Sequence, residues 1–290
     1  MTQQVSKRHH FIPVSILKNF CISGESTLYT RRADNGLPGR RNINRIFFRW
    51  HYNSFELVDG RKDDQVEKFF ARELDNFIPE WQVAFEQAAK GDNKILFSSK
   101  QSRYRFIQFF YNHMKRTPDL TAPLVEEVKS EVFSRDLESE FEKRHRPLTE
   151  QEKKLLEQDE FRDRAAANSR VSNFGKQSEN ILNRLAAMRI FVATPQRVSK
   201  QFIVASNPVV RFEDYPLQEL GTPGVELWTT ISPKIAVGFA HYDKTDNLQT
   251  DLLRLDDRSV RQLNQSLARR SHAIAGKSQA LLESLKKAAW

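Results

Sequence analysis

The chain has 290 residues, of which 39% are hydrophobic and 29% charged, and its formal charge is +9 at pH 7. This composition predicts a soluble protein with a substantial core, and it excludes a transmembrane helix because no window approaches about 18 consecutive apolar residues. The single cysteine, Cys21, excludes an intrachain disulfide and a cysteine-rich zinc site.

The positive charge is concentrated near the N-terminus. Residues 1–62 contain 11 Lys and Arg against 4 Asp and Glu, which leaves a balance of only +2 for the rest of the chain. Clustered cations favour a polyanion partner such as nucleic acid, because binding releases counterions. A basic face without such a partner is the other interpretation. No signal peptide is recognisable in this region, so we expect a cytoplasmic protein.

Two adjacent histidines, His9 and His10, stand between the cations Lys7 and Arg8 and an apolar segment over residues 11–20. A segment of this composition is expected to be buried. The histidines should therefore belong to the folded domain and not to a free terminus.

Arginines and aromatic residues are interleaved over residues 40–52. A strand over residues 26–31 and a turn over residues 33–36 precede them, and a meander of short strands is expected here. Basic side chains beside aromatic rings can bind single-stranded nucleic acid by phosphate contact and base stacking. Alternatively, the rings belong to the core and the arginines to a solvated face. The arginines are Arg40, Arg41, Arg45 and Arg49.

Helices are expected between residues 63 and 116. Apolar residues recur at three- and four-residue steps over residues 63–77, and a proline then opens a second helix that stops at Gly91. Ser98 or Ser99 is expected to cap a third, largely buried helix. That helix ends at residues 116–118, because a proline pushes the preceding residue out of the helical region.

A charged segment follows these helices. Between residues 126 and 163 there are 13 acidic and 8 basic residues. Pro147 divides the segment, and Thr149 is expected to cap the helix that restarts after it. This pattern predicts a solvated helical excursion over residues 126–170, within a single domain that spans residues 1–290.

The C-terminal half combines strands and helices. A turn signal, Ser206-Asn207-Pro208, directly follows one apolar strand. The whole pattern predicts an α+β fold, a predominantly helical single domain with a small mixed or antiparallel sheet. Strands are expected over residues 190–193, 201–205, 225–231 and 235–240, and helices over residues 181–188, from about 256 to 267, and 278–290.

Several short motifs follow one another along the chain in a characteristic order. A basic residue, His, an aromatic, an apolar residue and Pro lead into an apolar segment that ends in Asn-Phe. An Arg-Thr-Pro at a helix end, a Ser and Pro after a strand, a Ser-Pro between strands and an Asn in a C-terminal helix follow. These residues are Arg8, His10, Phe11, Ile12, Pro13, Leu17, Asn19, Phe20, Arg116, Thr117, Pro118, Ser206, Pro208, Ser232, Pro233 and Asn264.

This ordered set resembles the bacterial proteins grouped as domain of unknown function 4238, over nearly the whole chain. Some members of that family resemble single-gene antiphage defence proteins, so the resemblance implies a role in defence. The chain departs from the family pattern at Asn207, where the family usually has Asp after Ser206.

The candidate site combines residues that are distant in sequence. We expect His10 and Arg116 to be catalytic, because histidine exchanges protons near neutral pH and a guanidinium can bind two phosphoryl oxygens. His9 does not match the family pattern and is expected to be a bystander. No metal site is assigned. The residues expected to bind the ligand are Arg8, Arg41, Arg45, Ser206 and Asn207.

These observations lead to a functional hypothesis with open alternatives. The hypothesis is an antiphage defence effector that binds or acts on nucleic acid, as a nuclease if the His/Arg site is catalytic. The first alternative is a non-enzymatic sensor or interaction protein that recognises a phage component or a small ligand. The second is that His10, Pro13, Arg116, Ser206 and Asn207 form one polar structural cluster. A homo-oligomer is compatible with each, and no membrane partner is expected. The sequence does not determine whether a cofactor is used.

Overall fold

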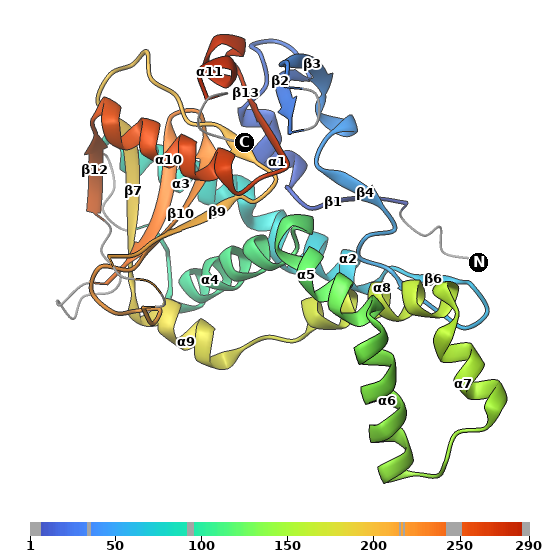
Figure 1. Ribbon diagram of the computed structural model, residues 1–290. Helices are drawn as coiled ribbons and strands as arrows, with labels where there is room; N and C mark the ends of the chain where they lie inside the picture. The colour runs from blue at the N-terminus through green and yellow to red at the C-terminus, as the bar shows by residue number, and fades with distance from the viewer. Residues whose placement is uncertain are drawn as a thin grey trace.

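The computed structural model describes residues 7–33, 36–91, 96–214, 216, 218–241 and 251–285 (Figure 1). It confirms the predicted α+β class, with helices in the majority. The helices are α1 (Val14–Asn19), α2 (Gln65–Phe69), α3 (Ile78–Lys90), α4 (Lys100–Lys115), α5 (Pro118–Lys129), α6 (Glu131–Arg144), α7 (Glu150–Glu157), α8 (Asp159–Gly175), α9 (Glu179–Ala187), α10 (Asp257–Arg269) and α11 (Gln279–Ser284), with short helical turns η1 (Ile43–Arg45), η2 (Phe70–Leu74) and η3 (Asp75–Phe77). The strands are β1 (Arg8–His10), β2 (Thr27–Arg32), β3 (Gly39–Asn42), β4 (Phe48–Trp50), β5 (Phe55–Glu56), β6 (Lys62–Asp63), β7 (Arg189–Pro195), β8 (Val204–Ala205), β9 (Val209–Phe212), β10 (Glu226–Ser232), β11 (Ile235–Ala240), β12 (Asp251–Leu255) and β13 (Ala273–Gly276).

The strands form two larger sheets and two short ribbons. The larger sheet is mixed, with the order β12-β7-β11-β10-β9 and a parallel β12–β7 pair. The second sheet is antiparallel, with the order β3-β2-β13-β8, so it joins N-terminal strands to a C-terminal strand. The ribbons are the antiparallel pairs β1–β4 and β5–β6.

The five-stranded sheet is covered on both faces. Phe239 of β11 packs on Phe110 of α4, with ring centroids 4.5 Å apart. Trp228 of β10 belongs to a second apolar cluster with Val260 and Leu263 of α10, and Figure 1 shows α10 crossing this sheet. Strands buried on both faces read as continuous apolar runs. This explains why the sequence predicts β10 and β11 closely.

Helix α4 is the central buried helix that the sequence predicts. The Ser99 hydroxyl caps it by accepting a hydrogen bond from the backbone N–H of Ser102 at 3.1 Å. Phe106, Phe109 and Phe110 are almost completely buried along its length. Because α4 is fixed by this packing, the residues at its C-terminal end are held in a defined position.

The segment from residue 63 to residue 77 is less regular than the predicted single helix. It begins with a strand residue, continues as α2, and then passes through the π turn η2 and the 3-10 turn η3. Isolated π turns within helices often occur at functional positions. Here the irregular turns place Asp75 against Arg116 at the end of α4.

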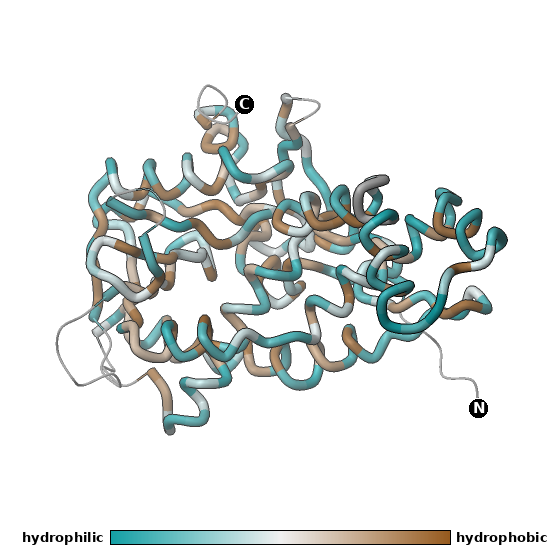
Figure 2. Tube along the Cα trace, turned by 60° about the horizontal axis from the view of Figure 1, so that its bottom comes forward, coloured by the Kyte–Doolittle hydropathy of each residue, from teal (hydrophilic) through white to brown (hydrophobic). Residues whose placement is uncertain are grey.

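Helices α6 and α7 form a hairpin that extends away from the rest of the molecule in Figure 1 and is largely hydrophilic in Figure 2. Thr149 caps α7 as predicted, in a reciprocal capping box with Glu152. Hydrogen bonds from the Arg146 guanidinium and from Thr149 lower the pKa of Glu152 to about 2. The predicted excursion over residues 126–170 covers this hairpin together with much of α8.

The C-terminal third differs most from the sequence prediction, which contains neither β12 nor β13. The predicted strand over residues 201–205 is also shorter, because the Asn264 side chain accepts a hydrogen bond from Ile203 N at 3.1 Å and donates one to Gln201 O at 2.8 Å. Part of the predicted last helix forms α11, while residues 286–290 lie outside the described part of the chain. None of the described helices is long and apolar enough to cross a bilayer.

Candidate functional site

The β1–β4 ribbon gives the two adjacent histidines different surroundings. Side chains alternate across a strand, so Arg8 and His10 face one way and His9 the other. The Arg8 guanidinium lies 5.4 Å from the ring centre of Phe48 and 5.1 Å from that of Trp50. The His10 ring lies 5.7 Å from that of Phe48. Burial lowers the pKa of His10, and a hydrogen bond with the backbone of Ile43 opposes this shift.

A cavity of about 510 Å³ opens beside this ribbon, between β3, η1, β4 and the residue that precedes β13. We call it the arginine pocket. Its charged and titratable wall consists of Arg32, Arg41, Arg45, Arg49 and His272. Within the described part of the chain, no acidic side chain lines it, and Arg41, Arg45 and Arg49 have no carboxylate at ion-pair distance. Guanidinium groups of this kind can bind phosphate oxygens in pairs.

Strand β4, which supplies one wall of the pocket, is bracketed by unusual backbone. Phe47 and His51, on either side of it, both have φ near 50°, in the left-handed region that non-glycine residues rarely adopt. Phe47 is held there by burial, by its carbonyl accepting a hydrogen bond from Phe11 N at 2.9 Å, and by ring packing with Phe11. Such strain persists where the surroundings determine it and is common at binding sites.

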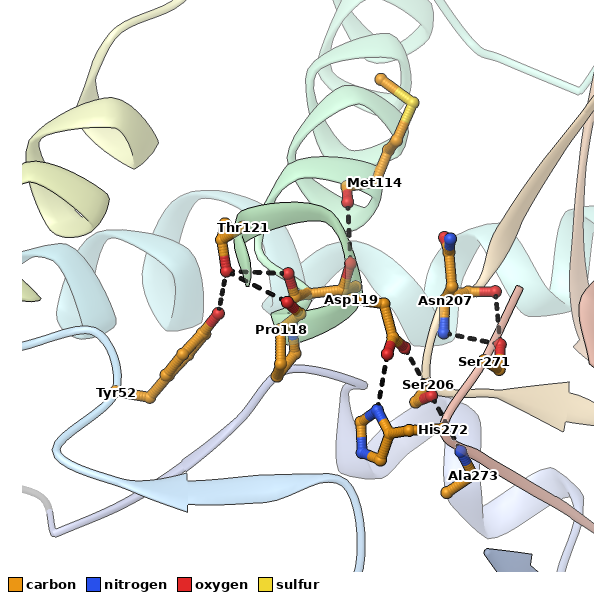
Figure 3. A network of polar contacts seen from close by, with 11 residues as sticks. Tyr52, Met114, Pro118, Asp119, Thr121, Ser206, Asn207, Ser271, His272 and Ala273 are labelled. Atoms are coloured by element: carbon orange, nitrogen blue, oxygen red, sulfur yellow. Dashed lines mark hydrogen bonds and ion pairs between the residues drawn. The ribbon is translucent and has the colours of Figure 1, made fainter. Parts of the chain in front are cut away.

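A polar network stands behind the pocket and reaches it through His272 (Figure 3). Nδ1 of His272 lies 2.7 Å from Oδ1 of Asp119, which is the second residue of α5. The Ser206 hydroxyl donates to the other oxygen of Asp119 at 2.6 Å. Ser206 also accepts a hydrogen bond from Ala273 N at 3.1 Å. The network therefore joins α5, the end of β8 and the start of β13.

This network is not a nucleophilic serine arrangement. In a Ser-His-Asp triad, the imidazole lies between the hydroxyl and the carboxylate. Here the Asp119 carboxylate lies between the hydroxyl of Ser206 and the imidazole of His272, as Figure 3 shows. Ser206 therefore positions Asp119. Asn207 contributes backbone: its N–H donates to the Ser271 hydroxyl at 3.0 Å.

Arg116 lies in a different environment, inside the protein. Its side chain is 1% exposed and forms a two-pronged ion pair with Asp75, at 3.0 and 3.1 Å. The guanidinium also lies 5.2 Å from the ring centre of Phe70. No contact in the described part of the chain joins Arg116 to His10, so the structure does not bring the two predicted catalytic residues together.

His9, predicted to be a bystander, belongs to a second buried group near Arg116. It is completely buried, and its Nδ1 accepts a hydrogen bond from Asn53 N at 2.8 Å. The Asn53 side chain donates to Glu67 at 2.6 Å, and the Glu67 carboxyl lies 3.9 Å from His9. Burial raises the pKa of Glu67 to about 7, although Asn53 and Arg116 oppose the rise. This group lies on the other face of β1 from His10.

A second basic cavity, of about 680 Å³, offers a comparison. Lys18, Lys90, Lys234, Arg254 and Lys277 line it together with Glu86. Several of its cations already serve the fold: Lys234 donates to the carbonyl of Lys200 at 2.7 Å, and Arg254 donates to Thr194 Oγ1 at 3.0 Å. The arginine pocket is therefore the stronger candidate for an anion. No group of three or more His, Cys, Asp or Glu that could hold a metal occurs among the described residues.

The structure gathers most of the predicted binding residues around one pocket. Arg41 and Arg45 line it, Arg8 packs on the aromatic rings beside it, and Ser206 supports its His272 through Asp119. Asp119 and His272 are not among the residues that the sequence predicts for the site. Asp119 directly follows the motif Arg116-Thr117-Pro118, so a signal for it existed, whereas nothing near His272 in sequence marks it.

Comparison with known proteins identifies one family. The family described as "Protein of unknown function (DUF4238)" matches residues 8–279, which is nearly the whole chain. No curated protein and no solved structure matches this chain. The match begins at Arg8 and so includes the β1–β4 ribbon, the Arg-Thr-Pro-Asp turn and His272. The chain therefore belongs to the DUF4238 family.

Proposed function

We propose that this protein is a cytoplasmic antiphage effector that binds single-stranded nucleic acid in the arginine pocket. The main observation behind the proposal is the composition of the pocket wall. Four arginines and a histidine line a cavity of about 510 Å³. A phosphodiester backbone supplies the anionic oxygens that such a wall can bind, and the release of counterions adds to the affinity.

An exposed aromatic ring beside the pocket supports a single-stranded ligand. Trp50 is 58% exposed, and its ring lies 6.0 Å from that of Phe48, which lines the pocket. An unpaired base can stack on an exposed indole, while a base inside a duplex cannot. A strand with its phosphates at Arg41 and Arg45 and one base on Trp50 would use both features.

The defence role is proposed because some members of the family resemble single-gene antiphage proteins, and the concentrated N-terminal charge is compatible with it. The structure adds a location for that charge, because Arg32, Arg41, Arg45 and Arg49 all belong to the first 62 residues. The basic N-terminal region is therefore one wall of a concave site.

Binding can be tested with two double variants of equal charge. Fluorescence anisotropy with a labelled single-stranded oligonucleotide should show that Arg41→Glu with Arg45→Glu weakens binding at least about tenfold. Arg61→Glu with Arg144→Glu, at two exposed ion-paired positions outside the pocket, should change it less than about threefold. Equal losses in the two variants would contradict a specific pocket.

The same variants separate the defence hypothesis from its alternative. In a phage plaque assay, the pocket variant should lose protection while the control variant keeps it. If the pocket variant still protects and shortening of the α6–α7 hairpin abolishes protection, the sensor or interaction hypothesis replaces the proposal.

A further inference from the structure

We propose that His272, oriented by Asp119, is the general base that cleaves RNA bound in the arginine pocket; this inference rests on the proposed binding of nucleic acid there. The observation behind this proposal is that the His272 imidazole both lines the pocket and contacts the partly buried carboxylate of Asp119. Nδ1 of His272 lies 2.7 Å from Asp119, and the His272 side chain is 39% exposed, so a ligand can reach it.

The contact with Asp119 selects the nitrogen that can take a proton. A carboxylate accepts hydrogen bonds and does not donate them, so Nδ1 of His272 carries the hydrogen in the neutral ring. Nε2 then has the lone pair, and Figure 3 shows it on the side of the ring away from Asp119. When Nε2 is protonated, the negative carboxylate stabilises the resulting imidazolium.

The pair is held in place without a ligand. The Ser206 hydroxyl donates to the second oxygen of Asp119 at 2.6 Å, and Ala273 N donates to Ser206 at 3.1 Å. The ring of Phe11 lies 6.2 Å from that of His272 on the pocket side. Because the imidazole of His272 is already oriented, little of the substrate's binding energy is needed to align it.

RNA is a suitable substrate for a general base beside phosphate-binding arginines, because its 2′-hydroxyl is an internal nucleophile. The proton of a 2′-hydroxyl passes to Nε2 of His272 while O2′ forms a bond to the adjacent phosphorus. The bond between phosphorus and O5′ breaks with its electron pair, O5′ takes a proton from water, and the imidazolium gives its proton to the hydroxide that remains. The products are a 2′,3′-cyclic phosphate and a free 5′-hydroxyl. Arg41 and Arg45, in the same pocket, would stabilise the charge that develops on the phosphoryl oxygens.

The test uses the full chain with labelled single-stranded RNA and with DNA of the same sequence, in buffer containing a chelator. The wild type should bind both strands, cut the RNA under single-turnover conditions, and leave the DNA intact. Mass spectrometry of the RNA fragments should find 2′,3′-cyclic phosphate ends. These two readouts need no variant, so they remain informative if a variant fails to fold.

Three variants locate the chemistry. His272→Gln should slow cleavage at least about a hundredfold, because a general base contributes at least that much. Asp119→Asn, which removes the charge and replaces one of the two accepting oxygens by an NH2 donor, should slow cleavage at least about tenfold. Asp119→Asn should bind RNA within about threefold of the wild type, since Asp119 does not line the pocket and a positioning role affects the rate and not the affinity. The matched control, His145→Gln at an exposed histidine after α6, should cut normally.

The outcomes distinguish failure of nucleic-acid binding from failure of RNA cleavage. Failure to bind either strand overturns the proposed function and the inference together. RNA that is bound but uncut, cleavage of RNA and DNA alike, or full activity of His272→Gln overturns this inference alone. Cyclic phosphate ends together with an inactive, folded His272→Gln protein support it.

Discussion

Replacing Glu67 by Gln should stabilise the protein in alkaline solution and not in acid. Glu67 is held between the buried His9 and Asn53, and burial raises the pKa of its carboxyl to about 7. Between pH 4.5 and 7 the unfolded chain ionises this carboxyl while the folded chain keeps it protonated. The folded state then binds more protons, so its stability falls as the pH rises.

The size of the effect follows from the shift. A pKa difference of one corresponds to about 1.4 kcal/mol, so a rise from 4.5 to about 7 costs about 3 kcal/mol once the pH exceeds 7. Gln carries no charge at any pH, and its side-chain oxygen can still accept the hydrogen bond that Asn53 donates at 2.6 Å. The variant should therefore avoid the loss.

The assay is urea unfolding of the wild type and of Glu67→Gln at pH 4.5 and pH 8.5. The free energy of unfolding of the variant, relative to the wild type, should rise by about 3 kcal/mol between the two pH values. Glu86→Gln, at an exposed position of α3, should shift it by less than about 0.5 kcal/mol. A Glu67→Gln protein whose advantage does not change with pH would refute the assignment of a buried, protonated carboxyl.

Two further substitutions test the packing around the site by the same unfolding assay. Arg116→Ala should lower the free energy of unfolding by about 3 kcal/mol or more, because it leaves the partly buried carboxylate of Asp75 without its partner. The control Arg72→Ala, at a side chain that is 79% exposed, should lower it by less than about 0.5 kcal/mol. Equal effects would contradict a structural role of Arg116. Gly238→Ala should destabilise by at least about 2 kcal/mol, since its Cβ would lie 2.4 Å from the ring of Trp228. The control Gly175→Ala should be neutral or slightly stabilising, because an added Cβ there meets no heavy atom of the described chain within 4 Å. A Gly238→Ala protein as stable as the wild type would contradict the close packing of Trp228 on Gly238.

Local features of the fold could be predicted because neighbouring residues determine them. Ser99 and Thr149 cap helices as expected, since each hydroxyl bonds to a backbone N–H three residues along the chain. Gly91 ends α3 with φ of 86°, a conformation that glycine adopts readily. The apolar runs of β10 and β11 likewise mark strands buried on both faces.

The assembly of the site could not be predicted in the same way. The arginine pocket needs β13 to pair with β2, and β13 is a four-residue strand whose pairing partner lies at the other end of the chain. His272 meets Asp119 across 153 positions of sequence, so no periodicity connects them. The sequence also favours the wrong histidine as the neighbour of Arg116. His9 and not His10 lies in the group near Arg116, and the face of each side chain is set only when β1 pairs with β4.

The salt dependence of nucleic-acid binding tests the central claim most directly. The dissociation constant for a single-stranded oligonucleotide should be measured at several salt concentrations for the wild type and for Arg41→Gln with Arg45→Gln. If both arginines contact phosphates in the pocket, the slope of log affinity against log salt should become shallower by about 1.4, about 0.7 for each contact. An unchanged slope and affinity would contradict a nucleic-acid site at the arginine pocket.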